Sequence, residues 1–150
     1  AEHFSKLITL VAEKFPKKKL LLTGSGKLDE LWAQKILASV TPGLCESAVS
    51  RTSLRELALL IKNSQALVSC DSLALHLGSA FQIPSVGLFG GSSLTVTETG
   101  PYFPTPSVGL NTPLLCFPCR KKTCAHHTCM KELSAHRVGA ELVQIISDSK

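Results

Sequence analysis

The feature that most constrains this chain is the point near residue 71 where an apolar run ends and a helical composition follows. Residues 66–70, Ala-Leu-Val-Ser-Cys, are typical of a buried β-strand, and the run stops at Asp71 and Ser72. Both residues favour the N-cap of a helix, so the sequence predicts a strand that turns directly into a helix. The N–H groups of the helix's first turn would open at the strand's carboxyl end, backed by the helix dipole. Such a turn suits an anionic ligand. We call residues 71–74 the Asp71 turn.

A second apolar strand is predicted at residues 84–89, and it breaks at the glycines that begin with Gly90. His76 lies four residues after Ser72, about one helical turn, so its ring is expected over the same opening. In an open parallel sheet, ligands bind at the carboxyl ends of the strands. The sequence therefore predicts a ligand site where these two strands end.

The other segments alternate between helical and strand patterns. Apolar residues at three- and four-residue steps indicate helices, short apolar runs indicate buried strands, and Ser53 with Glu56 forms a capping box. Helices are predicted at residues 2–15, 28–40, 53–61, 72–81 and 134–147, and strands at 18–23, 44–49, 66–70, 84–89 and 108–110. Residues 90–106 are predicted to be mostly loop. This alternation predicts an α/β fold with a doubly wound, Rossmann-like parallel sheet.

The composition limits the classes of partner. A chain of 150 residues with 44% hydrophobic and 18% charged residues is globular and suits one domain. Its net charge of +5 favours anionic partners, whereas its aromatic content of 5% disfavours a nucleic-acid surface built on stacked rings. No apolar run approaches the roughly 20 residues that would cross a bilayer.

The segment Gly-Ser-Gly-Lys at residues 24–27 follows a predicted strand and invites comparison with a phosphate-binding Walker A loop. That motif needs a glycine where Leu21 stands and a serine or threonine where Leu28 stands. The segment is therefore interpreted as a glycine turn between a strand and a helix.

Four cysteines are concentrated in the loop at residues 116–129, with two histidines, His126 and His127, inside the last interval. The cysteines are Cys116, Cys119, Cys124 and Cys129. Four soft ligands in so short a loop could close a tetrahedral structural zinc site. Reduced thiols without metal and disulfides are the alternatives. Cys45 and Cys70 stand alone in the sequence and are predicted to be core residues.

Several of these segments, in order, resemble the carboxyl-terminal domain of glycosyltransferase family 9, the bacterial ADP-heptose:lipopolysaccharide heptosyltransferases. They are the helix at 53–61, the Asp-Ser pair of the Asp71 turn followed by His76, and Leu-Phe-Gly at 88–90. The resemblance implies that residues 1–150 form the donor-binding domain of a two-domain GT-B enzyme, and we expect the chain to be a fragment. The chain departs from the family pattern at Leu73, where the family has glycine.

By resemblance, the Asp71 turn receives the diphosphate of a sugar donor. Backbone contacts fall to Ser72, Leu73 and Ala74, with Asp71 and His76 ordering the site and Gly90 beside it. Residues 50–53 resemble the family's Gly-Lys-Thr/Ser-Ser segment, which places Thr52 on the base and ribose side of the donor. Gly24 and Asp29 would border the same pocket.

The resemblance also implies an activity, transfer of heptose from an ADP-activated donor to the lipopolysaccharide core without a catalytic metal. The partners would be the ADP-sugar, an amino-terminal acceptor domain and the lipopolysaccharide core at the inner membrane surface, with no nucleic acid. The enzyme would be cytoplasmic, and this chain alone is expected to bind donor weakly without turnover.

Two other classes of function remain as alternatives at this point. One is a zinc-bearing module that binds nucleic acid through Arg120, Lys121 and Lys122. The other is a dinucleotide-dependent oxidoreductase, which is disfavoured because no Gly-x-Gly-x-x-Gly follows a predicted strand.

Overall fold

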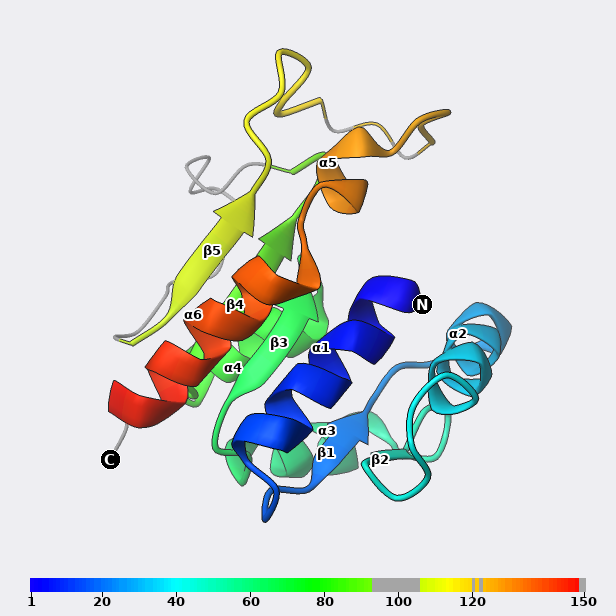
Figure 1. The fold of residues 1–150 in the computed structure, drawn as a ribbon, viewed down its shortest axis with the longest axis vertical. Helices are drawn as coiled ribbons and strands as arrows, with labels where there is room; N and C mark the ends of the chain where they lie inside the picture. The colour runs from blue at the N-terminus through cyan, green and yellow to red at the C-terminus, as the bar shows by residue number, and fades with distance from the viewer. Residues whose placement is uncertain (93–105, 120, 122, 149–150) are drawn as a thin grey trace. The chain divides into compact units, whose positions relative to one another are not determined.

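The computed structural model describes residues 1–92, 106–119, 121 and 123–148 (Figure 1). The chain divides into two compact units, Ala1–Leu57 and Ala58–Lys150, and each is described by itself. Most of the predicted loop at 90–106, residues 93–105, lies outside the described residues. The boundary between the units falls inside helix α3 (Leu54–Lys62).

The first unit contains two helices and two strands. They are α1 (Glu2–Lys14), β1 (Leu20–Leu22), α2 (Lys27–Leu37) and β2 (Cys45–Ser47). The two strands pair in parallel, with Leu20 opposite Cys45 and Leu22 opposite Ser47. The parallel pairing places the carboxyl ends of β1 and β2 side by side, so the loops that follow them leave from one edge.

The core of the first unit lies between the helices and the strands. It is made of Ile8, Ile36, Val40 and Cys45. In α1 the apolar residues Leu7, Ile8 and Val11, which recur at helical steps, are all buried. In α2, Leu31 and Trp32 are exposed, and the Lys35 ammonium lies over the Trp32 ring at 4.9 Å from its centre.

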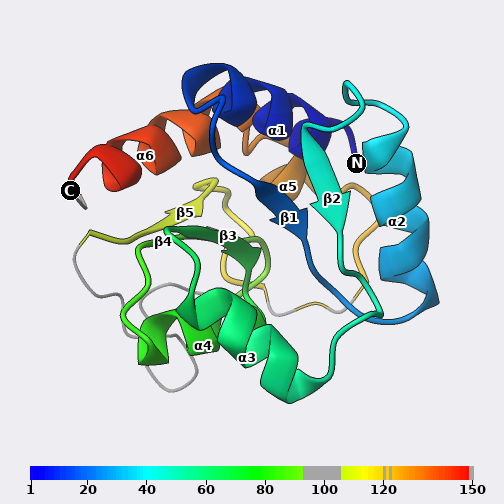
Figure 2. The same ribbon diagram turned by 90° about the horizontal axis from the view of Figure 1, so that it is seen from below.

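The second unit is built on a three-stranded sheet. Its elements are β3 (Leu67–Cys70), α4 (Leu73–Ala80), β4 (Ser85–Phe89), β5 (Val108–Asn111), α5 (Thr128–Lys131) and α6 (Ala135–Asp148). The strands are all parallel in the order β3-β4-β5. Helices α4 and α6 lie on opposite sides of this sheet (Figure 2). Helices therefore cover both faces of this parallel sheet, as is usual for parallel sheets.

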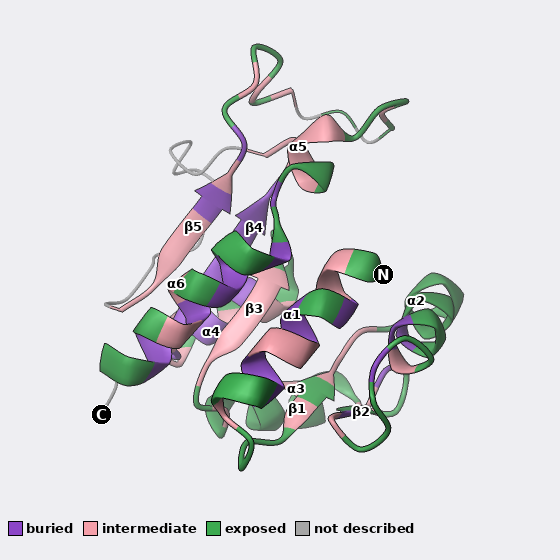
Figure 3. Ribbon diagram, in the orientation of Figure 1, coloured by how far each residue is buried: buried purple, intermediate pink, exposed green. Residues whose placement is uncertain are grey.

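Burial is greatest along β4, the central strand, where every residue from Ser85 to Phe89 is buried (Figure 3). From one side α4 contributes Leu75, which is 1% exposed. The helix approaches closely at Gly78, where an added Cβ would lie 2.8 Å from Leu67 Cδ2. From the other side α6 contributes buried apolar residues that recur at helical steps, among them Val138, Leu142, Ile145 and Ile146.

The predicted parallel α/β architecture is confirmed, with the strands distributed between a sheet of two and a sheet of three. Each predicted helix and strand is present within a few residues of its predicted bounds. One helix was not predicted, the single turn α5 at the end of the cysteine loop. Within the described part of the chain, no helix is both long and apolar enough to cross a bilayer.

Candidate functional site

The Asp71 turn connects the carboxyl end of β3 to α4, as the sequence predicted. Ser72 is the N-cap residue of α4, with extended backbone angles of φ −155° and ψ 170°. Its side chain makes no capping hydrogen bond. Instead its hydroxyl oxygen lies 2.9 Å from that of Ser69 on β3. The Ser72 hydroxyl is therefore held at the end of the strand, to one side of the helix terminus.

The N-cap side chain therefore does not occupy the N–H groups at the start of α4. The Ser72 carbonyl accepts the N–H groups of Leu75 and His76 at 3.1 and 3.3 Å, whereas the N–H groups of the first helical residues lie ahead of any intrahelical partner. The first turn of α4 contains no acidic residue. Because unpaired N–H groups and the helix dipole both favour negative charge, this end of α4 suits an anion.

The side chains around the turn point away from the core. Asp71, Leu73 and His76 are all exposed, and Leu73 is 55% exposed. Leu73 therefore does not fill the turn with its side chain. Since His76 is exposed, it is not the packed core histidine that an isolated histidine on a helix often becomes.

Gly90 and the Asp71 turn follow neighbouring strands of the sheet. Cys70, the last residue of β3, pairs with Leu88 on β4, and the Asp71 turn and Gly90 follow within two residues of that pair. Neighbouring strands are about 4.8 Å apart. The predicted site residues of the second unit therefore follow two strands that end at the same edge of the sheet.

The isolated cysteines differ from each other. Cys45 is buried, as predicted, and loss of hydration raises the pKa of its thiol. The prediction for Cys70 is wrong, because this residue is exposed. Cys70 is the last residue of β3, where the chain leaves the sheet for the turn. The surrounding protein atoms and then the Asp71 carboxylate raise the pKa of its thiol.

In the first unit, the predicted residues Gly24 and Asp29 contact each other. The Asp29 carboxylate folds back over the turn after β1 and accepts the Ser25 N–H at 2.9 Å. A Cβ at Gly24 would lie 2.6 Å from Asp29 Oδ2, so this position requires glycine. The carboxylate suits hydroxyl donors such as those of a ribose, and it repels phosphate.

The turns that follow β1 and β2 are joined by Ser50, which was not among the predicted site residues. Its N–H donates to the Gly24 carbonyl at 2.9 Å, and its hydroxyl accepts the Gly26 N–H at 3.0 Å. Ser50 has a φ of 56°, in the left-handed region. The family segment that residues 50–53 resemble has glycine at the position of Ser50. Because glycine readily adopts a positive φ, that glycine is the sequence signal that points to this conformation. Thr52 lies two residues further on and is half-buried.

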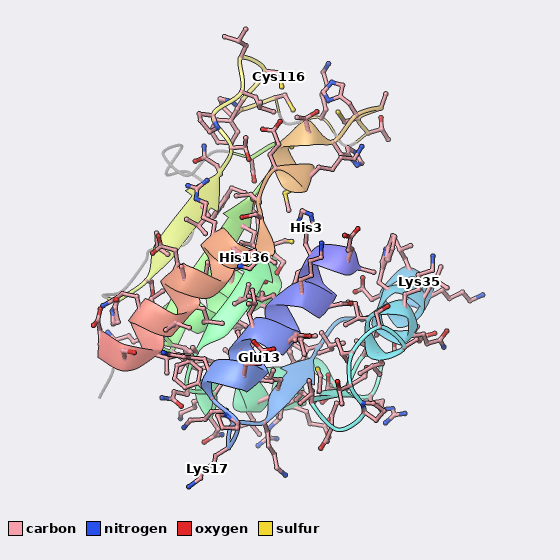
Figure 4. The ribbon with its side chains drawn as sticks, viewed as in Figure 1. His3, Glu13, Lys17, Lys35, Cys116 and His136 are labelled. Carbon is pink, nitrogen blue, oxygen red and sulfur yellow. The ribbon has the colours of Figure 1, made fainter. Side chains whose placement is uncertain are left out.

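The cysteine loop is not assembled into a metal centre in the residues that the structure describes. No three His, Cys, Asp or Glu side chains there are placed to hold a metal ion, and all six cysteines are free thiols. Cys116 is exposed on the loop beyond β5 (Figure 4). The zinc ligation predicted for Cys116, Cys119, Cys124 and Cys129 stays a prediction.

Cys124 has the most polar surroundings of these thiols. Its sulfur accepts the His127 N–H at 3.4 Å and lies 3.6 Å from Nδ1 of His126. Hydrogen bonds from the backbone of His127 and His126, followed by the charges of Lys121 and Lys131, lower the pKa of the Cys124 thiol. This thiol therefore ionises more readily than an ordinary cysteine.

Two solved structures share this fold over nearly the whole chain. The *E. coli* structure described as ADP-heptose lps heptosyltransferase II superposes with a TM-score of 0.78 at 21% identity, covering 97% of this chain and 41% of that one. A glycosyl transferase family 9 structure from Veillonella parvula gives a TM-score of 0.79 at 19% identity, over 98% of this chain and 41% of its own. The fold is therefore one that glycosyltransferases use.

The model of glycosyltransferase family 9 (heptosyltransferase) matches residues 1–130, and the chain belongs to this family. Two relatives, both named lipooligosaccharide heptosyltransferase 2, come from *Campylobacter jejuni* serotypes O:6 and O:2. They are 27% and 26% identical over 97% and 99% of this chain. The chain spans about half of their length, 46% in each case.

Proposed function

We propose that this chain is the donor-binding domain of a GT-B heptosyltransferase, which transfers heptose or a related sugar from an ADP-activated donor to the lipopolysaccharide core. The observation that supports this most strongly is the Asp71 turn. It presents an acid-free helix start at the carboxyl edge of a parallel sheet, in a chain that belongs to family 9.

The donor's diphosphate is proposed to bind at the start of α4. The N–H groups of Leu73 and Ala74 would donate to its oxygens, with the Ser72 hydroxyl, already held by Ser69, as an additional donor. Asp71 precedes the N-cap, outside the helix, and with exposed His76 it would orient the sugar side of the donor. Gly90 would let the donor approach the end of β4 without meeting a Cβ.

The ADP ribose and base are proposed to bind the loops of the first unit, near Thr52, Gly24 and Asp29. The Asp29 carboxylate accepts hydrogen bonds, so a ribose hydroxyl is a better partner for it than a phosphate.

The remaining parts of the enzyme are proposals from family membership. The acceptor site and general base would lie in an amino-terminal domain, and the acceptor would be presented at the cytoplasmic face of the inner membrane. No metal or other cofactor would be required for catalysis. A structural zinc at the cysteine loop would need Cys116, Cys119, Cys124 and Cys129 to rearrange.

A charge change at the N-cap tests the function. Ser72→Asp keeps a favourable N-cap residue, so α4 should remain folded, while its carboxylate repels the diphosphate. Calorimetric titration of the 150-residue chain with ADP should show weak binding that falls about tenfold or more in this variant.

The control is Ser147→Asp, which adds the same charge to the exposed last turn of α6. Helix α6 has 14 residues, so this site is about 20 Å from its other end. Unchanged ADP affinity in Ser72→Asp, with both variants folded by circular dichroism, would place the anion elsewhere. Salt-sensitive binding of a DNA duplex in place of ADP would favour a nucleic-acid module.

A further inference from the structure

The start of α2 departs from an ordinary capping box. Its N-cap is Gly26, so Asp29 occupies the third helical position, where an acid usually accepts the N–H of the N-cap residue. The Asp29 carboxylate instead accepts the N–H of Ser25, one residue earlier in the chain, at 2.9 Å. Its hydrogen bond is therefore displaced by one residue toward the end of β1.

Ser50 accounts for this displacement, because it occupies the N–H that a capping box would use. Its hydroxyl oxygen accepts the Gly26 N–H at 3.0 Å, and its own N–H donates to the Gly24 carbonyl at 2.9 Å. These two hydrogen bonds hold the residues on either side of Ser25. The Ser25 N–H between them remains available to the Asp29 carboxylate.

The backbone of Ser50 and its hydroxyl make separable contributions. Its φ of 56° is a conformation that glycine adopts without strain, and the N–H that donates to Gly24 does not depend on the side chain. The family segment that residues 50–53 resemble has glycine at this position. The hydrogen bond to Gly26 is therefore a feature that serine adds in this chain.

The displaced carboxylate lies over the end of β1. A Cβ on Gly24 would lie 2.6 Å from Asp29 Oδ2, Asp29 is exposed, and no other described residue donates a hydrogen bond to its carboxylate. In Figure 2, β1 and β2 lie side by side and point the same way, so the loops that carry Asp29 and Thr52 leave one edge. The carboxylate can thus accept hydrogen bonds from a ligand at that edge.

We propose that the Ser50 hydroxyl is a positioning group for the donor's ribose. By occupying the Gly26 N–H, it keeps the Asp29 carboxylate on Ser25, over the end of β1, where the carboxylate accepts the ribose hydroxyls. This inference rests on the proposed binding of the ribose near Asp29. Without the Ser50 hydroxyl, the carboxylate moves to the Gly26 N–H and completes an ordinary capping box. The start of α2 stays capped in both arrangements, so the ligand preference changes more than the stability does.

Nuclear magnetic resonance tests the first step without a ligand, because a charge-assisted hydrogen bond shifts the resonance of the proton that it holds. In the original chain, Asp29→Ala should shift the Ser25 amide proton and leave that of Gly26 little changed. In the Ser50→Gly and Ser50→Ala backgrounds, which both lack the hydroxyl, Asp29→Ala should shift the Gly26 amide proton instead. If the Ser25 amide proton is still the one that shifts in both backgrounds, Ser50 does not direct Asp29 and the proposal fails.

Calorimetry tests the ribose. The 150-residue chain is titrated with ADP, with an ADP analogue that lacks both ribose hydroxyls, and with pyrophosphate, which has no ribose. The original chain should prefer ADP to the analogue about tenfold, as expected for hydrogen bonds to a charged group. Ser50→Ala and Ser50→Gly should reduce this preference to about twofold and leave the affinity for pyrophosphate unchanged. A general loosening of the fold would instead weaken all three ligands together.

Ser39→Ala is the matched control, since it removes an exposed hydroxyl just beyond the other end of α2, where it donates to the Lys35 carbonyl at 2.8 Å. This variant should keep the preference of the original chain. An unchanged preference in both Ser50 variants would overturn the role of Ser50 and leave the donor site standing. If the original chain showed no preference, the ribose placement and the role of Ser50 would both be overturned. Binding of neither ADP nor pyrophosphate would overturn the donor site itself.

Discussion

The helix starts that follow β1 and β3 differ in electrostatic character. The turn from β1 to α2 has Asp29 and Glu30 in the first turn of the helix, and Asp29 accepts a local N–H. The turn from β3 to α4 has no acid in its first turn and no capping side chain. Acids at a helix start neutralise the attraction that the dipole exerts on anions.

The two turns therefore favour different chemical groups. An anion gains from the start of α4, whereas at α2 it would meet two carboxylates. The glycines alone would have suggested that the anion binds at the start of α2, since Gly24 and Gly26 flank the turn before that helix. These glycines have local structural roles instead. Gly26 has a φ of 91°, and Gly24 leaves room for the Asp29 carboxylate.

The largest expected effect comes from filling the space above Gly24. Gly24→Ala places a methyl group against Asp29 Oδ2, Cγ and Cβ, so the acid must leave its position over the turn. Unfolding in urea should show a loss of about 2 kcal/mol, within the range of steric and cap-removing substitutions.

Removing the acid gives the matched control for this change. In the Asp29→Ala background the methyl group has no carboxylate to displace, so adding Gly24→Ala should cost less than it does alone. A coupling free energy near zero between the two changes would mean that Asp29 does not restrict position 24.

A smaller effect is expected from restoring the family's glycine at position 73. Leu73→Gly removes the Cβ beside the proposed phosphate site, while glycine in the helix costs about 1 kcal/mol. We expect ADP to bind a few-fold more tightly even though the melting temperature falls. Leu73→Ala keeps the Cβ and loses the rest of the exposed side chain, so it should leave affinity unchanged. Tighter binding by both variants would attribute the effect to side-chain bulk.

Much of the fold was predictable because local patterns agreed with the packing. The residues of α6 that recur at helical steps are the ones buried against the sheet, and the capping box predicted at Ser53 is present, with Ser53 N–H donating to Glu56 at 2.7 Å. Helix α2 shows the limit of this reasoning. It has apolar residues on two faces, Ala33 with Ile36 and Leu31 with Trp32, and periodicity does not say which face is buried.

The site was predictable to the extent that it follows from strand order. Neighbouring parallel strands end at one edge, so it followed from recognising both strands that the Asp71 turn and Gly90 leave the sheet at the same edge. Contacts that depend on loops did not follow. Met130 meets Gly90 across 40 positions of sequence, and the one-turn helix that carries Met130 has too few residues for a periodic signal.

The smallest expected effect concerns a third helix start, that of α3, which is capped by side chains. The Glu56 carboxylate accepts hydrogen bonds from the Ser53 hydroxyl and N–H, both at 2.7 Å, and these lower its pKa. Because the folded-state pKa lies below the unfolded one, the stabilising contribution is fully present above the ordinary value of 4.5. It is lost as pH falls through the lower folded value.

Glu56→Gln removes this titration and keeps an oxygen that can accept from Ser53. Urea unfolding should therefore find the variant slightly less stable than the original chain at pH 7, with the difference closing as the pH falls below 4.5. A difference that stayed constant with pH would show that the carboxylate's charge does not contribute to the cap.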